Sequence, residues 1–326
     1  MKALVYTGPR ALELRDVPDP QVGAASLIRV AHVGICGSDM HAWAGHDERR
    51  PAPLILGHEV AGEVIQGPLE GRRVTVNPLV SCGRCHACKA GRENLCADRQ
   101  IISMPPREGG FAELLAMPEG NLVELPDHMT TAAAALAEPI ACGWHAVGLA
   151  ERALGAIGED TSCMVQGGGA IGLGAALVLR ARGVRRLHVA EPHPERRAAI
   201  EAEGIAAFDP SVEGPSGLDL VIDGVGIPAT RAAACAAVRP GGAIVHIGLG
   251  SPEGGLDIRR MTLQEITFIG SYTYTAQEFR DTAAAMFAGA LGGLSWPEIR
   301  PLSQGAAAFE DIAAAQVAAP KVILAP

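Results

Sequence analysis

The chain has 326 residues, of which 48% are hydrophobic and only 4% are aromatic. A chain of this length exceeds what one hydrophobic core usually serves, so it predicts two domains, with cores built mainly from Ala, Val, Leu and Ile. The formal net charge of −9 argues against a nucleic acid or an anionic membrane surface as the partner.

No segment predicts secretion or membrane insertion. Residues 1–20 lack the apolar stretch of a signal peptide. Residues 163–179 carry no charge, but these 17 residues fall short of the roughly 20 that a membrane helix needs. Their glycines cluster at one end, which favours a strand, a turn and a helix. We therefore expect a cytoplasmic protein.

A first polar cluster lies in residues 34–43, GICGSDMHAW, and continues in GHE at 57–59. A thiolate, imidazoles and carboxylates suit a zinc ion that keeps one position open for water or substrate. Each residue alone has a structural alternative, since a cysteine also packs as a small hydrophobe and a histidine also forms hydrogen bonds in a core. The candidate residues are Cys36, Ser38, Asp39, His41, His58 and Glu59.

Four cysteines follow in residues 81–96, SCGRCHACKAGRENLC, with spacers of two, two and seven residues. Clustered cysteines in a long chain indicate metal binding rather than disulfides. Short spacers bring three thiolates together and the fourth closes a tetrahedron, which is typical of structural zinc. An iron–sulfur cluster is the alternative, but its usual run ends in C-x3-C-P. The predicted ligands are Cys82, Cys85, Cys88 and Cys96.

Residues 131–150, TAAAALAEPIACGWHAVGLA, are almost wholly apolar and contain one carboxylate, Glu138. An isolated ionised carboxylate is costly to bury, so it needs a cation, a set of donors or a metal. This segment alone does not identify which of the three Glu138 has.

A glycine pattern, G-x-G-x-x-G, lies between an apolar strand at 162–166 and an apolar helix that ends near Gly183. A dinucleotide-binding loop requires this context. The first glycine makes the turn, the second admits the pyrophosphate, and the third lets helix and strand pack closely. The predicted cofactor contacts are Gly167, Gly168, Gly169, Ala170, Ile171 and Gly172.

A second strand at 185–191 ends in Glu191, 24 residues after Gly167. An acid about 20 residues after the loop binds the adenosine ribose hydroxyls and repels a 2′-phosphate, which favours NAD over NADP. Arg196 and Arg197 favour the opposite choice, because a nearby arginine holds a 2′-phosphate. The alternative for these arginines is a solvated helix face.

Three more strands are expected at 218–226, 241–250 and 265–272, with a helix near 228–238. Alternating strands and helices predict a parallel, doubly wound sheet of the α/β class. We place the nucleotide-binding domain at 140–270 and assign 1–139 and 271–326 to a second, β-rich domain.

Together these motifs resemble the zinc-dependent medium-chain alcohol dehydrogenases. GICGSDMH, GHEVAGEV, the four cysteines, GGFAEL, EPIACGWHAV and GGGAIGLG follow one another in the order of that family. The resemblance extends from MKALVY to KVIL, which is essentially the whole chain. It implies a GroES-like catalytic domain with a structural-zinc lobe at about 81–97, joined to a Rossmann domain.

The resemblance also implies the catalytic zinc ligands. Cys36 and His58 match two ligands, and Glu59 matches the adjacent carboxylate that binds or exchanges at the metal. Asp39 resembles the residue that orients His58. In the polyol, threonine and butanediol branch a glutamate within an EP dipeptide stands at the position of Glu138. Glu138 therefore resembles a direct or water-bridged zinc ligand, and a buried salt bridge to an arginine is the alternative.

Further positions match the family's relay and cofactor contacts. Ser38 and His41 correspond to a proton relay, whereas Cys142, Gly248 and Leu249 fall where the chain meets the nicotinamide. Sugar-alcohol dehydrogenases often carry an arginine where this chain has Ser271, which argues against a polyol. A partly apolar pocket is expected from Trp43, Met104 and Tyr272.

The resemblance implies an oxidoreductase that uses zinc and NAD. It would transfer a hydride between a secondary alcohol or polyol, or the corresponding ketone, and NAD(H). The alternatives are an NADP-dependent aldehyde or ketone reductase of the same superfamily and a non-catalytic nucleotide-binding protein, against which the zinc ligands argue. The family also suggests a homodimer or homotetramer, paired through the strand near 262–270.

Overall fold

The alternating strands and helices after residue 160 form a parallel sheet. In the computed structural model, which describes residues 1–212 and 214–326, the strand order is β13-β12-β11-β14-β15-β16. A doubly wound sheet of this order opens a crevice where the order reverses, here between β11 and β14. The strands are β11 (Ser162–Gln166), β12 (Arg186–Ala190), β13 (Ala206–Phe208), β14 (Leu218–Asp223), β15 (Val238–His246) and β16 (Thr267–Gly270).

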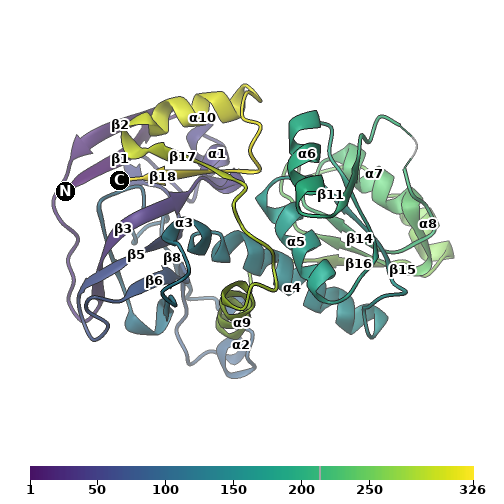
Figure 1. Cartoon of the computed structure of the whole chain (residues 1–326), viewed down its shortest axis with the longest axis horizontal. Helices are drawn as coiled ribbons and strands as arrows, with labels where there is room; N and C mark the ends of the chain where they lie inside the picture. The colour runs from purple at the N-terminus through teal and green to yellow at the C-terminus, as the bar shows by residue number, and fades with distance from the viewer. Residues whose placement is uncertain (213) are drawn as a thin grey trace.

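Helices cover this sheet, which lies at the right of Figure 1. Four residues of β11 are buried, as expected for a parallel strand whose two faces are both covered. The apolar helix predicted after the glycine loop is α5, and the helix predicted near 228–238 is α7. The helices of this body are α5 (Ala170–Ala181), α6 (Pro194–Ala202), α7 (Pro228–Ala237) and α8 (Ile258–Leu263).

The other body is rich in β-structure and lies at the left of Figure 1. Its largest sheet has the order β10-β6-β5-β3-β18-β17, with β9 also paired to β3, and a smaller sheet has the order β2-β1-β4. The strands are β1 (Lys2–Gly8), β2 (Ala11–Asp16), β3 (Ser26–Gly34), β4 (Leu54–Ile55), β5 (Glu59–Gln66), β6 (Arg73–Val76), β9 (Leu114–Met117), β10 (Leu122–Glu124), β17 (Pro297–Pro301) and β18 (Lys321–Ala325).

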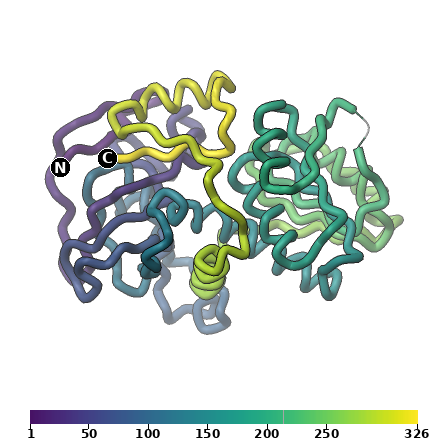
Figure 2. Tube along the Cα trace, viewed as in Figure 1, coloured from purple at the N-terminus to yellow at the C-terminus, as the bar shows by residue number. Residues whose placement is uncertain are grey.

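The two ends of the chain meet in this β-rich body, as the trace in Figure 2 shows. Strand β18 pairs antiparallel with β3, so that Ile323 lies opposite Gly34. The chain after residue 290 therefore returns to the β-rich body, which also contains the first strands of the chain. The remaining helical elements here are α1 (Gly37–Trp43), η2 (Glu119–Asn121), η3 (Leu302–Gln304) and α10 (Gly305–Ala313). This arrangement confirms the predicted fold class, a β-rich body plus a doubly wound sheet.

Helix α4 (Ala137–Leu154), preceded by α3 (Thr131–Ala134), lies between the two bodies. It packs against α5, against α9 (Ala276–Phe287) and against β5. Contact with α5 is very close, since a Cβ added to Gly143 would lie 2.6 Å from the Ala175 nitrogen. Small residues therefore dominate the apolar 131–150 segment. Helix α4 crosses the predicted boundary at 139/140, and the domain limits stay a prediction.

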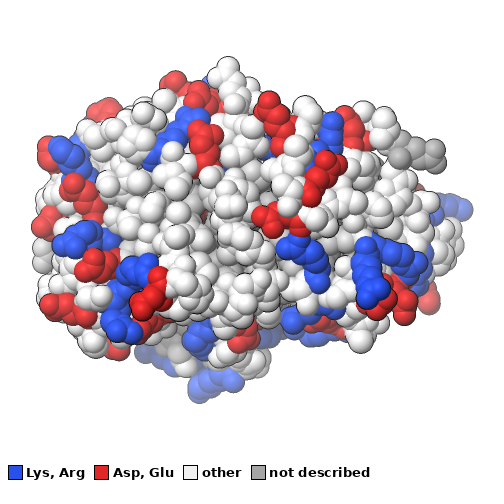
Figure 3. Space-filling view, in the orientation of Figure 1, with Lys and Arg blue, Asp and Glu red and all other residues white. Residues whose placement is uncertain are grey.

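A small lobe projects from the β-rich body. It contains β7 (Leu79–Val80), α2 (His86–Lys89), η1 (Glu93–Leu95) and β8 (Gln100–Ile101), and β7 pairs with β8. On the face drawn in Figure 3, charged side chains of both signs surround a largely uncharged centre. None of the described helices combines the length and the apolar character needed to cross a membrane.

Candidate functional site

Two adjoining cavities lie at the carboxyl ends of β11 and β14. The first, of about 300 Å³, is the glycine-loop groove, lined by residues that include Gly167, Glu191 and Lys321. The second, of about 320 Å³, is the cysteine–histidine cavity, lined by residues that include His58 and Glu138. Both volumes place a ligand-sized space at the switch point of the sheet. The residues that line both cavities are Cys36, Gly37, Ile171, Gly224 and Val225.

The glycine loop has the geometry that a diphosphate needs. Gly167 has a φ of 91°, a conformation that strongly favours glycine. A Cβ on Gly172 would lie 1.8 Å from the Gly167 carbonyl oxygen, so the close approach of α5 to the loop requires glycine there. A Cβ on Gly169 would meet nothing within 4 Å and would project into open space. The groove therefore has room for phosphate groups at the N-terminus of α5.

Glu191 is a buried carboxylate of this groove. Its Oε2 accepts a hydrogen bond from the Gly168 nitrogen at 2.7 Å, and its Oε1 accepts one from the His193 nitrogen at 2.9 Å. Gly168 holds Glu191 in this way and does not line the groove itself, unlike Ala170 and Ile171. Each carboxylate oxygen keeps a lone pair for a ribose hydroxyl.

The two arginines near Glu191 lie in different environments. Arg196 lines the groove and donates from Nη2 to the Val317 carbonyl at 3.1 Å. Arg197 instead braces the turn after β12, since its Nη1 donates to the carbonyls of Glu191 at 2.8 Å and Pro192 at 2.7 Å. Only Arg196 is therefore placed to meet a ligand in the groove.

Cys36 and His58 line the second cavity, and the fully buried Glu59 lies beside them. Each offers a ligand atom, and these atoms all lie within 4.8 Å of one another. The buried Oε2 of Glu59 has no hydrogen-bond partner among the described residues. Soft and hard donors of this kind suit a zinc ion with an open coordination position. The residues present therefore fit the zinc that the sequence predicts.

Asp39 supports His58. Its Oδ1 lies 3.4 Å from His58 Nδ1, and its Oδ2 accepts a hydrogen bond from the Cys36 nitrogen at 3.0 Å. Burial raises the pKa of Asp39, but the charge and hydrogen bond of His58 outweigh it and the net shift is downward. A carboxylate that holds Nδ1 leaves Nε2 of His58 for a metal.

Lys321, which is not among the site residues predicted from the sequence, lies against Glu59. Its Nζ is 2.6 Å from Glu59 Oε1 and donates to the Ile35 carbonyl at 2.8 Å. Lys321 is 6% exposed and also lines the glycine-loop groove. The two residues are 262 positions apart in the sequence, so no local sequence pattern predicts their contact. The same side chain thus faces both the predicted metal region and the predicted cofactor region.

Glu138 lines the cysteine–histidine cavity, and Tyr274 is its hydrogen-bond donor. The Tyr274 hydroxyl donates to Glu138 Oε1 at 2.8 Å, and both residues are buried. The arginine alternative is not supported, since no ion pair of Glu138 occurs among the described residues. Glu138 lies outside the Cys36–His58–Glu59 group. Burial raises the pKa of Glu138, and the Glu59 carboxylate adds to that shift while His58 opposes it.

The other predicted residues also line the cysteine–histidine cavity. Ser38 lies there on α1, with the exposed His41 one turn later. Cys142 lies on α4, four residues after Glu138. Burial and the charge of Glu138 raise the pKa of Cys142 well above 9.0, which keeps it a neutral thiol. The loop after β15 contributes Gly248 and Leu249.

The predicted partly apolar wall is present in part. Met104 and Tyr272 line the cavity, as expected, together with Pro78, Leu79 and Ile101. Trp43 does not line it. Its ring packs in the core against Phe309, with ring centroids 6.0 Å apart, because α1 presents this residue to the β-rich body and not to the cavity.

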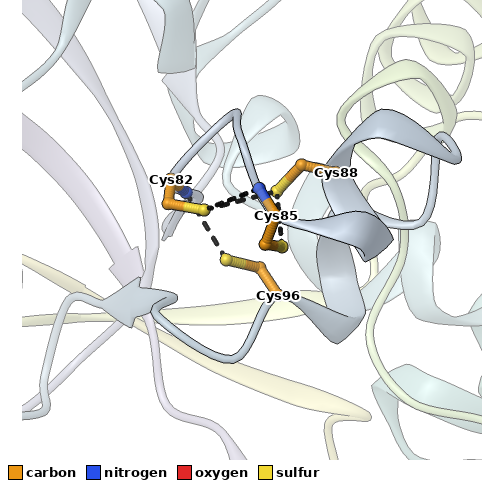
Figure 4. A group of neighbouring side chains, drawn as sticks. All are labelled: Cys82, Cys85, Cys88 and Cys96. Carbon is orange, nitrogen blue, oxygen red and sulfur yellow. Dashed lines mark hydrogen bonds between the residues drawn. The ribbon is translucent and has the colours of Figure 1, made fainter.

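The four cysteines of the lobe converge, as Figure 4 shows. Their sulfur atoms all lie within 4.8 Å of one another, with Cys85 Sγ and Cys88 Sγ 3.5 Å apart. Four thiolates with no open position suit a structural zinc. The lobe is tied to the cavity wall, since Asn94 Nδ2 donates to the Tyr272 carbonyl at 2.9 Å and Glu93 Oε1 accepts from the Ala276 nitrogen at 2.8 Å.

Comparison with known proteins gives matches over both bodies. The family described as alcohol dehydrogenase GroES-like domain matches residues 24–127, and the family described as zinc-binding dehydrogenase matches residues 170–288. L-galactonate-5-dehydrogenase of Escherichia coli K12 is 35% identical over 89% of this chain and 88% of its own length. Sorbitol dehydrogenase of Bacillus subtilis 168 is 32% identical over 84% and 82%, respectively. The structure of acetophenone reductase from Geotrichum candidum in complex with NAD superposes with a TM-score of 0.90, at 25% identity, over 100% of this chain and 97% of that one.

Proposed function

The chain belongs to the zinc-dependent medium-chain alcohol dehydrogenase family and is an oxidoreductase. On that premise we propose that it oxidises a secondary hydroxyl of a polyhydroxy compound with NAD, or reduces the corresponding ketone with NADH. One observation carries the proposal. Cys36 and His58 line one cavity, with the buried Glu59 beside them, and the glycine loop lines the adjoining cavity. Substrate oxygen and nicotinamide would therefore meet where the cavities share their lining.

We assign the catalytic zinc to Cys36, His58 and Glu138, with Glu59 as the carboxylate that exchanges at the metal. The structural zinc belongs to the four lobe cysteines. A zinc ion held there would supply polarisation of the substrate oxygen, and a nicotinamide in the adjoining groove would supply the hydride acceptor. Two buried carboxylates, Glu59 and Glu138, lie in the region of Cys36, and the buried Lys321 contacts Glu59. A divalent cation would complete the charge balance.

The chain's own residues would then handle the proton. Ser38 lies in the cavity next to Cys36, and its hydroxyl would accept the substrate hydroxyl proton while it gives its own proton to the nicotinamide ribose. His41, one turn along α1, is exposed and would pass the proton from the ribose to water. Asp39 keeps His58 in one orientation through its contact with Nδ1. Apolar side chains such as Met104 and Ile101 line the cavity and would restrict the water that reaches the reacting carbon.

Glu191 supports NAD as the preferred cofactor, because its buried carboxylate lies where the adenosine ribose is expected and repels a 2′-phosphate. Arg196 in the same groove supports the second candidate, an NADP-dependent aldehyde or ketone reductase. We expect Glu191→Gln to weaken the preference for NAD, while Arg196→Gln leaves NAD affinity unchanged. Initial rates with each cofactor decide between the candidates.

We further propose a cytoplasmic homodimer or homotetramer. All eight cysteines are free, which fits a reducing compartment. Strand β16 is an edge of the parallel sheet, and Ile258 and Leu263 of α8, the helix that precedes it in the chain, are 61% and 72% exposed. An edge strand and exposed apolar residues both favour pairing with a second copy.

A substrate panel tests the proposed function. The zinc-loaded enzyme is mixed with NAD and with polyols, sugar acids, simple secondary alcohols and amino alcohols, and formation of NADH is followed by absorbance. We expect turnover of secondary hydroxyls in polyhydroxy compounds and loss of that turnover in Cys36→Ala. Absence of turnover with every class and in both directions would contradict the proposal.

A further inference from the structure

Two consecutive arginines, Arg49 and Arg50, line the cysteine–histidine cavity, and the proposed chemistry uses neither of them. Among the described residues that line this cavity they are the only lysine or arginine side chains, and Glu138 is the only carboxylate. The whole chain carries a net charge of −9, so an anion approaches it against repulsion unless a local cation receives it. The position of these arginines therefore bears on which substrates the cavity admits.

Asp47 shapes the turn that carries both arginines. Its Oδ1 accepts a hydrogen bond from the Arg49 nitrogen at 3.1 Å, and its carbonyl accepts one from the Arg50 nitrogen at 3.0 Å. Its carboxylate also binds both guanidinium groups, at 2.8 Å to Arg49 Nε and 2.8 Å to Arg50 Nη1. One carboxylate thus faces two guanidinium groups, and the Asp47–Arg49–Arg50 cluster keeps one net positive charge.

The guanidinium of Arg50 is occupied by hydrogen bonds within the protein. It is 3% exposed, and its Nε donates to the Ser103 carbonyl at 2.9 Å. Its Nη1 donates to the Ser38 carbonyl at 3.2 Å, which ties the arginine turn to α1. Arg50 therefore acts as a positioning residue that holds the turn against the cavity.

The guanidinium of Arg49 has N–H donors that make no hydrogen bond to the described residues. Asp47 occupies one edge of its guanidinium, with Nε at 2.8 Å from Oδ1 and Nη2 at 2.9 Å from Oδ2. Its Nη1 makes no hydrogen bond to any described residue, and the side chain is 59% exposed. The edge formed by Nη1 and the second Nη2 hydrogen is therefore free. A free guanidinium edge matches the two oxygens of a carboxylate in a bidentate pair.

We propose that Arg49 binds the carboxylate of the substrate, so that the cavity selects polyhydroxy acids over neutral polyols. This inference rests on the proposed function, because it names the substrate class of the same cavity. The planar two-oxygen end of a carboxylate fits the single free edge. A phosphate dianion would leave more of its oxygens without donors, since Arg50 is already engaged.

The test compares sugar acids with the matching neutral polyols on the zinc-loaded enzyme. Galactonate and gluconate are paired with galactitol and sorbitol, and galactitol 1-phosphate is added as the phosphate probe. We expect Arg49→Gln to lower kcat/KM for the acids about 10–100-fold, mainly through KM, since this is the range for a charge-assisted hydrogen bond. Rates with the neutral polyols should be unchanged. Arg49→Lys keeps the charge without the planar edge and should retain part of the selectivity.

Glu48→Gln is the matched control, because Glu48 is an exposed residue of the same turn and does not line the cavity. It should leave the preference for acids unchanged. Equal kcat/KM for acids and neutral polyols in the parent enzyme overturns the inference and leaves the proposed function standing. An equal loss for both classes in Arg49→Gln also overturns it, as does a preference for galactitol 1-phosphate over galactonate.

A binding measurement separates this inference from the proposed function. Calorimetry follows galactonate and gluconate binding to the complex of the enzyme with NADH, whether or not the enzyme turns them over. Weaker binding by about 10–100-fold in Arg49→Gln supports the role of Arg49. Equal binding in parent and variant, or no binding to the parent, overturns it.

Discussion

Buried ionisable side chains concentrate around the cysteine–histidine cavity. Asp39, Glu59 and Glu138 are at most 6% exposed, and Lys321 is the lysine among them. Burial lowers the pKa of Lys321, but the charges of Glu59 and Cys36 outweigh it and the net shift is upward, so the lysine stays charged. Burying several carboxylates together costs free energy unless a cation joins them. The proposed zinc would supply that cation.

Glu138 gives the first prediction at this scale. If it serves the catalytic zinc, Glu138→Ala should lower zinc occupancy or kcat by about 10–100-fold, as when a metal's supporting residues are lost. Glu138→Cys should restore part of the zinc binding, because a thiolate also binds zinc. Metal content by mass spectrometry and steady-state kinetics check both.

Cys142→Ala is the control for Glu138, since Cys142 lines the same cavity from the same helix. It should keep both zincs and alter mainly cofactor affinity. If Cys142→Ala lost the catalytic zinc while Glu138→Ala kept it, Cys142 would be the zinc ligand and the assignment of Glu138 would be wrong.

The Lys321–Glu59 pair gives a second prediction. Lys321→Met leaves the Glu59 carboxylate buried and without its cation, which should lower the free energy of unfolding by about 3–5 kcal/mol. Urea unfolding of the cofactor-free protein measures the change. Adding Glu59→Gln should recover part of the loss, because the unpaired charge is then removed.

Lys2→Met is the matched control, since Lys2 pairs with Asp16 at 3.2 Å but both side chains are more than half exposed. Its effect should stay below about 1 kcal/mol. Similar losses from Lys321→Met and Lys2→Met would mean that burial does not set the strength of the Lys321–Glu59 contact.

At the scale of helices and strands, the elements that could be predicted are those whose pattern lies within a short stretch of sequence. The strand, glycine turn and helix that became β11, the loop and α5 lie within about twenty consecutive residues, and so do the four lobe cysteines. The short strand β13 was missed, because three residues carry no periodicity. Tyr274 could not be placed against Glu138, because 136 residues separate them and only the packing of α9 against α4 brings them together.

Strand β14 gives a prediction about pH. Asp219 on β14 accepts hydrogen bonds from the Ser162 nitrogen at 2.8 Å and from Arg239 Nε at 2.6 Å, which ties it to β11 and β15. Burial raises the pKa of Asp219, but these hydrogen bonds outweigh it and lower the pKa to about 2 from 3.8. A depressed pKa stabilises the fold above the unfolded value, and this contribution disappears as pH falls from 3.8 through about 2.

Asp219→Ala should therefore be less stable than the parent near neutral pH, and the difference should shrink as pH falls below about 4. Urea midpoints across this range measure it. Asp127→Ala, at an exposed position, should show no such trend. A difference between Asp219→Ala and the parent that stays constant with pH would contradict the role of the Asp219 charge.

The cysteine lobe gives the second prediction for an element. Cys85→Ser should remove one of the two zincs and lower Tm markedly, because a closed zinc site contributes folding free energy. It should also raise KM for substrate, since the lobe holds Tyr272 in the cavity wall through Asn94. Cys235→Ala, a buried cysteine outside the lobe, should keep both zincs. Iron in the lobe, or unchanged zinc in Cys85→Ser, would contradict the assignment.

At the scale of the whole molecule, the site forms because the C-terminal segment of the chain packs against the N-terminal strands. Strand β18 carries Lys321 from the end of the chain to β3, while α4 carries Glu138 between the two bodies. The identity of the two bodies was readable from motif order, since each motif is local. The cavity wall was predicted only in part. Met104 and Tyr272 were expected there from the family resemblance, whereas Arg49 and Arg50 were not, because they reach the wall from a turn that carries no recognisable motif.

Transfer of deuterium tests the central claim most directly. A polyhydroxy substrate carrying deuterium on the carbon of its secondary hydroxyl is oxidised with NAD by the zinc-loaded enzyme, and the reduced cofactor is analysed by mass spectrometry. Direct hydride transfer predicts that the deuterium appears in NADH, that none is lost to water, and that Cys36→Ala forms no labelled NADH. Unlabelled NADH from the parent enzyme, or labelled NADH formed at the parent rate by Cys36→Ala, would contradict the account.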